Sequence, residues 1–119
     1  MDRKELVRQY RDTPRTTGVG VVRHTATGKT FLLAGNDIQA LLNRTRAQLS
    51  SGGFPYGELQ RDWKAAGPDG FAFEVLDTLP TPTETDFDPT VDLKLLEAMW
   101  LEKLEPYPPT GYNRRRKVS

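Results

Sequence analysis

Glu97 is the carboxylate most able to do chemistry in this chain, because it lies within an apolar segment. At helical spacing it falls among four apolar residues, Leu93, Trp100, Leu101 and Leu104. A carboxylate on such a face is costly to bury unless it pairs with a cation or coordinates a metal. Two interpretations therefore stay open: a metal or phosphate-site residue, and a salt-bridged glutamate at the rim of the face.

Arg44 and Gln48 lie one helical turn apart and can face the same ligand. The planar guanidinium of arginine matches the geometry of a phosphate group. Gln48 can hydrogen-bond a phosphate, but its amide is a poor general base. The alternative for Arg44 is a solvated helix face. Arg46 points elsewhere on the same helix, so we assign it no role and use it as a control.

The C-terminal part of the chain combines an asparagine with a run of cations. Asn113 can orient Glu97 or a phosphate, or it can simply form a turn. The run Arg114, Arg115, Arg116 and Lys117 can neutralise several phosphates, which predicts salt-sensitive nucleic-acid binding. The alternative for this run is a plain terminal tail.

The composition excludes several classes of site. With 119 residues the chain suits one domain, and its net charge of +1 leaves attraction of nucleic acid to local patches. The absence of cysteine excludes disulfides, thiolate metal sites and a cysteine nucleophile. His24 is the single histidine, so a multi-histidine zinc site is impossible. We expect a cytoplasmic protein that does not enter a membrane, because no apolar run approaches about 20 residues.

These residues must be positioned by short elements. The spacing of apolar residues predicts helices over 2–11, 38–49 and 90–104, and a further helix that follows the Pro55 turn and stops at Gly67-Pro68. β-branched and aromatic runs predict strands over 19–24, 29–34 and 71–76. Asp37 and the Asp88-Pro89 pair are expected to cap helices, and residues 51–53 to end one. The third strand alternates poorly, so we expect it in the centre of the sheet, covered on both faces.

The order of elements predicts an α+β fold, with a small, mostly antiparallel three-stranded sheet flanked by helices. We divide the chain into an N-terminal helix (1–14), a domain (15–113) and a basic tail (114–119). Trp63 and Trp100 are expected in the core and His24 at a strand end. Lys29 is expected to be solvated. Tyr56 and Tyr112 can stack on a base or pack at the rim, and packing at the rim is expected.

Several segments occur in the order found in GIY-YIG nuclease domains. Gly18-Val19-Gly20, Gly28-Lys29 and Leu33-Ala34-Gly35 resemble the opening of such a domain. Arg44 lies nine residues after Gly35, a spacing typical of the family arginine. The later matches are the helix-to-strand segments 59–63 and 71–76, Glu97, and Gly111-Tyr112-Asn113. The resemblance covers about residues 18–113, and it rests on the order of individually weak matches.

The resemblance implies a GIY-YIG-like sheet and a site built from Arg44, Glu97 and Asn113. It implies that Glu97 binds Mg²⁺ or Mn²⁺ and that the substrate is nucleic acid, with DNA expected. The chain departs from the family at both signature tyrosines, where Gly20 and Leu33 stand. The neighbouring Val22 and Phe31 cannot move a proton either, although Tyr10 or Tyr56 could reach the site. Loss of a general base typically costs about 100- to 10,000-fold in rate.

Three hypotheses follow. The chain is a divalent-metal-dependent endonuclease with an altered site, a non-catalytic nucleic-acid-binding module, or a regulatory protein-interaction domain on the same fold. The missing tyrosines and the basic tail favour the second hypothesis slightly over the first. Whether the chain is an enzyme is left open at this point.

Overall fold

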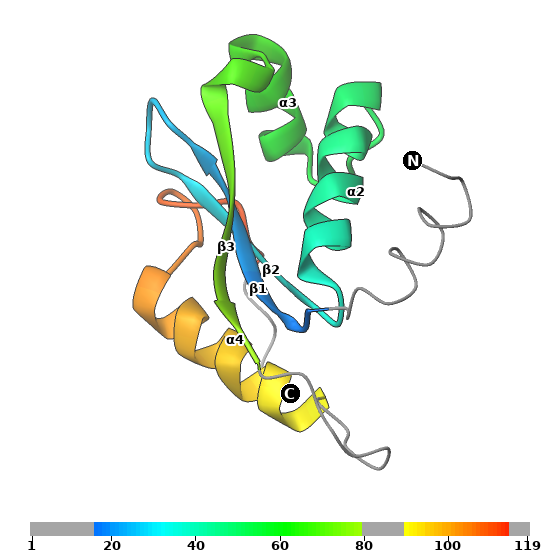
Figure 1. The fold of residues 1–119 in the computed structure, drawn as a ribbon. Helices are drawn as coiled ribbons and strands as arrows, with labels where there is room; N and C mark the ends of the chain where they lie inside the picture. Colours follow the sequence, from blue (N-terminus) through cyan, green and yellow to red (C-terminus); the bar gives the residue numbers. More distant parts are fainter. Residues whose placement is uncertain (1–15, 80–89, 115–119) are drawn as a thin grey trace, which may run out of the picture.

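The computed structural model describes residues 16–79 and 90–114. A three-stranded antiparallel sheet has the order β2-β1-β3, from β1 (Gly18–His24), β2 (Thr30–Gly35) and β3 (Phe71–Thr78). The helices are α2 (Ile38–Ser51), α3 (Gly57–Ala66), the short 3₁₀ helix η1 (Pro68–Gly70) and α4 (Thr90–Leu104). Helices α2 and α3 cover one face of the sheet and α4 covers the other (Figure 1). The predicted α+β fold is confirmed.

Part of the prediction falls outside the described residues. The helix expected over 2–11, the Asp88-Pro89 cap and the cations Arg115, Arg116 and Lys117 all lie there. Within the described residues, no helix is long and apolar enough to cross a membrane.

The β1–β2 hairpin forms where the sequence predicted it. Its turn contains Gly28, whose φ of 78° lies in the left-handed region that glycine adopts without steric cost. The backbone closes the turn with bonds from the His24 amide to the Lys29 carbonyl (2.8 Å) and from the Gly28 amide to the His24 carbonyl (2.7 Å). The hairpin therefore fixes the register that pairs the strands.

Helix α2 begins at the predicted cap. The Asp37 carboxylate accepts a hydrogen bond from the Ala40 amide at 3.2 Å, which satisfies a free amide of the first turn. Gly52 ends the helix with a φ of 82°, and its amide bonds to carbonyls of the last turn. The helix runs to Ser51, two residues past the prediction (51−49). Its buried side chains form one stripe along the helix: Ile38, Leu42, Thr45 and Leu49.

The main core lies between the sheet and the α2–α3 pair. It unites the α2 stripe with Leu59 and Trp63 of α3, and with the strand residues Val22, Phe31 and Phe71. Trp63 is in the core, as predicted, with its ring 5.2 Å from that of Phe71. Strand alternation places Gly20, Val22, Phe31 and Leu33 on this face.

Helix α4 packs differently, because none of its residues is fully buried. Its half-buried residues form one stripe that faces β1 and β2: Leu93, Leu96, Glu97, Trp100, Leu101 and Leu104. Trp100 is thus not a core residue, contrary to the prediction. The indole N–H explains this, since it donates to the Asp77 carboxylate at 3.3 Å and needs a polar partner at the edge of the layer.

Strand β3 lies at an edge of the sheet, so its predicted central position is wrong. The central strand is β1, whose first five residues are all buried. The apolar run of β3 has a different cause: Phe71 and Phe73 pack on Trp63, while Val75 remains 42% exposed. An edge strand that packs one face on a helix can be as apolar as a central one.

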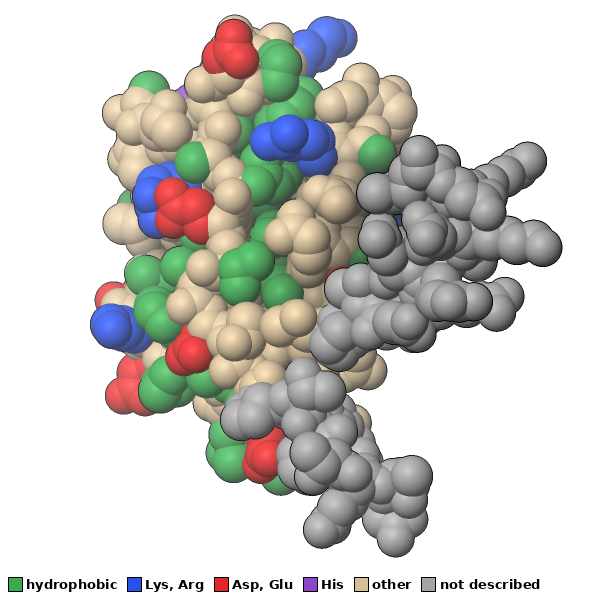
Figure 2. Space-filling model, in the orientation of Figure 1, with side chains coloured by type: hydrophobic (Ala, Val, Ile, Leu, Met, Phe, Trp, Pro, Cys, Tyr) green, Lys and Arg blue, Asp and Glu red, His purple; other side chains and the backbone are tan. Residues whose placement is uncertain are grey.

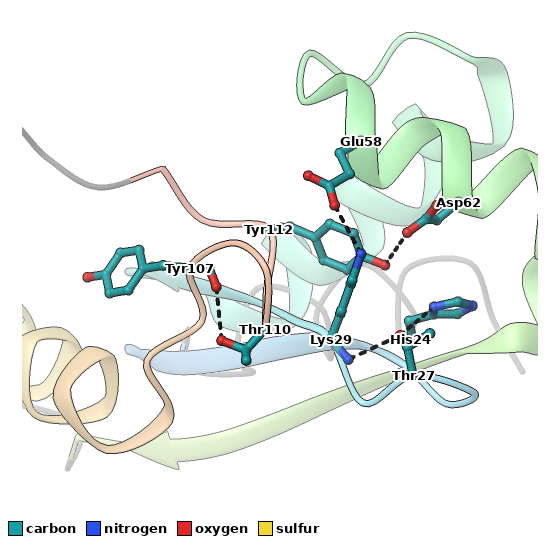
Figure 3. A network of polar contacts seen from close by, with 8 residues as sticks. All are labelled: His24, Thr27, Lys29, Glu58, Asp62, Tyr107, Thr110 and Tyr112. Carbon is teal, nitrogen blue, oxygen red and sulfur yellow. Dashed lines mark hydrogen bonds and ion pairs between the residues drawn. The ribbon is translucent and has the colours of Figure 1, made fainter.

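The chain after α4 returns to the free edge of β2. Gly111 forms a parallel bridge with Thr30, and the Tyr112 amide donates to the Thr30 carbonyl at 2.8 Å. Tyr112 is 4% exposed, so its predicted place at the rim is wrong. Its hydroxyl donates to the Asp62 carboxylate at 2.8 Å, and this partner makes burial of the polar group affordable (Figure 3).

Candidate nucleic-acid interface

The two glycine-containing tripeptides that resemble the nuclease motifs lie side by side in the sheet. The β1–β2 register pairs Gly18 with Gly35, Val19 with Ala34, and Gly20 with Leu33. The two positions where the resemblance expects tyrosine are therefore direct cross-strand partners. Both point to the α2 face, where Leu33 packs against the core. Neither residue carries a group that can accept or donate a proton.

The space beside Gly20 is already filled. A Cβ atom placed there would lie 3.1 Å from Leu42 Cδ1, 3.2 Å from Ile38 Cδ1 and 3.0 Å from the Glu74 carbonyl. A Cβ at this position would require its neighbours to shift by a few tenths of an ångström, and a tyrosine ring would need more room. The position of the first signature residue is thus tightly packed as well as lacking its side chain.

Arg44 lines a pocket of about 310 Å³ at the end of β2. The other lining residues belong to the end of β2, the connecting turn and the first turns of α2: Ala34, Gly35, Asn36, Asp37, Ala40 and Leu41. Arg44 is exposed, so its guanidinium is available to a phosphate that enters the pocket. The Asp37 carboxylate also lines the pocket, and one of its oxygens is bonded to the Ala40 amide.

Gln48 and Arg46 lie on different sides of α2. Gln48 is exposed one turn after Arg44, and the helix runs antiparallel to β2 from its start beside Gly35. Arg46 instead lies over the ring of Phe73 in β3, at 4.5 Å from the ring centroid. Arg46 is therefore a suitable control for Arg44, as the sequence predicted.

Glu97 lies on the opposite face of the sheet from α2, in the middle of the half-buried stripe of α4. Trp100, one helical turn after Glu97, donates a hydrogen bond to the Asp77 carboxylate. Asp77 of β3 pairs with Val19 of β1, which pairs with Ala34 of β2 on its other side. Since α4 ends near the Thr30 end of the sheet, Glu97 lies toward the end that carries Gly18 and Gly35. Arg44 and Glu97 thus lie at the same end of the sheet but on its opposite faces.

Asn113 uses its side chain to hold the edge of β2. Its Oδ1 accepts from the Leu32 amide at 2.8 Å, and its Nδ2 donates to the Leu32 carbonyl at 3.0 Å. The Asn113 amide donates to the Pro106 carbonyl at 2.8 Å. With both ends of its amide engaged by backbone, Asn113 positions the strand and the residue that follows it. The sequence could not reveal this partner, because Leu32 lies 81 residues away.

Arg114 continues directly from Asn113 and lies over the ring of Tyr56, with its Cζ 4.7 Å from the ring centroid. Tyr56 is half-buried against Phe31, at 5.1 Å between ring centroids. We call Arg44, Gln48, Tyr56 and Arg114 the β2-edge surface. Three of them were predicted to bind nucleic acid; for Tyr56 the sequence left base stacking open, with packing at the rim as the expectation.

A polar network fastens the end of the sheet opposite the pocket (Figure 3). Lys29 pairs with Glu58 of α3 at 3.1 Å, and its ammonium lies 5.8 Å from the Tyr112 ring centroid. Lys29 is therefore not simply solvated, contrary to the prediction. Burial, helped by the hydrogen bond to Asp62, raises the pKa of Tyr112 well above its ordinary value. This hydroxyl stays protonated at neutral pH and cannot replace a lost general base.

The described residues contain no group of three or more histidine, cysteine or carboxylate side chains placed to hold a metal ion. Glu97 alone could supply one oxygen ligand to Mg²⁺ or Mn²⁺, and substrate phosphates and water would have to complete the coordination. A single carboxylate fits such a shared site weakly.

Comparison with solved structures identifies the fold. The catalytic domain of the homing endonuclease I-TevI has a TM-score of 0.66 and 22% identity, over 84% of this chain and 99% of that one. A mutant of the catalytic domain of the intron endonuclease I-TevI has a TM-score of 0.66 and 19% identity, over 82% and 92%. This chain has a GIY-YIG-like fold.

The sequence itself matches no protein-family model and no curated protein. The GIY-YIG-like fold therefore rests on the arrangement of strands and helices, which the resemblance of motif order had predicted. At 22% and 19% identity, the similarity to these structures shows the fold alone. Activity and ligand depend on the residues at the site.

Proposed function

We propose that this chain is a nucleic-acid-binding module that does not cleave its ligand, with DNA as the expected ligand. A phosphate binds at the Arg44 pocket, and the backbone of the nucleic acid follows the β2-edge surface toward Arg114. The observation that carries the proposal is the tight packing at Gly20, where an added Cβ would press against Leu42 and Ile38. Gly20 and Leu33, at the two positions of the signature tyrosines, carry no group for proton transfer.

Charge supports a local and salt-sensitive interaction. The chain has a net charge of only +1, and cations and carboxylates are interspersed over the face shown in Figure 2. Binding must then come from a few well-placed cations, each of which releases counterions from the nucleic acid. The tail cations Arg115, Arg116 and Lys117 would add to this attraction.

The first experiment measures binding of labelled DNA over a range of salt concentrations for the wild type, Arg44→Ala and Arg46→Ala. We expect Arg44→Ala to weaken binding to all DNA sequences and to reduce the slope of log K against log salt by about 1. Arg46→Ala should bind like the wild type, since Arg46 lies over Phe73. Equal behaviour of all three proteins would instead favour a protein-interaction domain.

A metal-dependent endonuclease is the second candidate, favoured by the half-buried position of Glu97 at the same end of the sheet as Arg44. Glu97 would bind Mg²⁺ or Mn²⁺, and Arg44 would hold the scissile phosphate. The test is cleavage of branched and single-stranded DNA with Mn²⁺ by the wild type and Glu97→Ala. We expect no cleavage by either protein. Metal-dependent cleavage that disappears in Glu97→Ala would establish the nuclease.

A further inference from the structure

Tyr56 and Arg114 form a layer at the edge of β2, with the guanidinium over the ring, built from residues far apart in the chain. The guanidinium carbon of Arg114 lies 4.7 Å from the ring centroid of Tyr56, and Arg114 is exposed. A nucleobase can stack on an aromatic ring or on the plane of an arginine guanidinium. The layer therefore presents the kind of surface that binds an unpaired base.

The ring of Tyr56 is held in place from below. Phe31 meets it at 81° with 5.1 Å between ring centroids, and Phe54 meets it at 52° with 5.6 Å. Phe31 itself is 6% exposed and belongs to the main core. Little side-chain freedom remains to be lost when a ligand stacks, which favours binding.

Arg114 is held in place from the preceding residue. Asn113 bonds to both the amide and the carbonyl of Leu32, and its own amide bonds to the Pro106 carbonyl. The backbone that carries Arg114 is thereby attached to β2. This gives the two hydrogen bonds of the Asn113 side chain a functional consequence, because they place the guanidinium over Tyr56.

The layer also offers polar contacts. Within the described residues, every buried side-chain polar atom has a hydrogen-bond partner. The Tyr56 hydroxyl has no such partner there, so it must be in contact with solvent. It can therefore accept or donate a bond to a base edge or phosphate. The carboxylates of the neighbouring helix α3 are engaged elsewhere, Glu58 with Lys29 and Asp62 with Tyr112.

The position of the layer relative to the pocket sets the size of the ligand. Phe31, beneath Tyr56, and Gly35, in the Arg44 pocket, are four residues apart on β2, or roughly 13 Å at the rise of a strand. Gln48 lies along α2 beyond Arg44 in the direction of the layer. A strand of several nucleotides can thus place a phosphate at Arg44 and a base at Arg114.

We propose that Tyr56 and Arg114 bind an unpaired nucleobase by stacking, so that this chain prefers DNA with single-stranded nucleotides over continuous duplex. This proposal rests on the proposed function, because it assigns a ligand class to the same β2-edge surface. In a duplex both faces of each base are covered by its neighbours, so the layer has nothing to stack on. The phosphate contact at Arg44 acts on both forms of DNA.

The test measures fluorescence anisotropy of a labelled single-stranded oligodeoxynucleotide and of the duplex of the same sequence, with the full chain. Tyr56→Leu should weaken single-strand binding on the order of ten-fold and leave duplex binding unchanged. Tyr56→Phe keeps the stacking face and should bind the single strand more tightly than Tyr56→Leu does. Arg114→Lys keeps the charge but loses the plane, so it should also weaken single-strand binding selectively.

The outcomes separate this inference from the function on which it rests. If the wild type binds neither ligand, the proposed function fails and the stacking site with it. If Arg44→Ala weakens both ligands while Tyr56→Leu and Arg114→Lys change neither, the function stands and the stacking site is overturned. An equal loss for single strand and duplex in Arg114→Lys would also overturn it. Since Arg114 is exposed, this variant tests the proposal even if Tyr56→Leu fails to fold.

Discussion

The two faces of the sheet are covered by helices of similar length but very different packing. Helix α2 buries four side chains, with exposed fractions of 1% for Ile38 and Leu49 and 2% for Leu42 and Thr45. Helix α4 buries none, although it is the more apolar helix, and it leaves Leu95 66% and Met99 50% exposed. Apolar composition therefore does not measure how much a helix contributes to the core. The arrangement of the apolar residues around the helix decides it.

The contrast between the faces predicts a large difference between two chemically equal substitutions. Leu42→Ala on α2 should lower the free energy of unfolding by about 2–5 kcal/mol, because it leaves a cavity in the main core. Leu95→Ala on α4 should change it by less than about 0.5 kcal/mol. Urea denaturation of both variants measures the difference. Similar losses would mean that α4 packs as tightly in solution as α2.

The attachment of the returning chain to β2 provides the next largest effect. Asn113→Ala removes two hydrogen bonds to the Leu32 backbone and should cost about 1–3 kcal/mol of stability. Asn43→Ala is the matched control, because Asn43 is exposed on α2 and its Oδ1 accepts a hydrogen bond from the Gln39 side chain at 3.3 Å. The comparison uses urea midpoints. Equal midpoints for both variants would show that the edge of β2 holds without Asn113.

Tyr112 ties the returning chain to the α2–α3 face and should make stability depend on pH. Tyr112→Phe should cost about 1 kcal/mol at neutral pH, through the lost bond to Asp62. The pKa of Tyr112 is raised in the folded state, so its contribution is complete below the ordinary tyrosine pKa of about 10 and is lost as pH rises above it. The difference in unfolding free energy between wild type and Tyr112→Phe should therefore shrink above about pH 10. A difference that stays constant to higher pH would contradict the raised pKa.

The smallest effect is expected for the ion pair on the α4 face. Arg23 and Glu74 form two hydrogen bonds at 3.0 and 2.9 Å, but their side chains are 40% and 42% exposed. A double-mutant cycle with Arg23→Gln and Glu74→Gln should give a coupling energy below about 1 kcal/mol that decreases with salt. A larger, salt-insensitive coupling would mean that this face is less accessible to water than the exposed fractions indicate.

The β2-edge surface shows how far sequence reasoning reached. Arg44, Gln48 and Arg114 were chosen from residue type and spacing; the structure has Arg44 at the end of β2 and Arg114 over Tyr56. Asn113 was chosen as well, yet its contact with Leu32 was not foreseen. For Tyr56 packing at the rim was preferred to base stacking, because nothing in the local sequence indicates that Arg114, 58 residues later (114−56), lies over its ring. Roles that depend on distant pairs could not be predicted.

What the sequence by itself determined is local. Three residues act on the chain within one turn of themselves: Gly28 in the hairpin turn, Asp37 at the start of α2 and Gly52 at its end. The ends of the hairpin strands and of α2 were therefore predicted closely. Only the tertiary structure decided that β3 is an edge strand, that Tyr112 is buried, and that Leu42 and Ile38 fill the space beside Gly20. These features arise from packing between segments distant in sequence, and the same local pattern is compatible with several such packings.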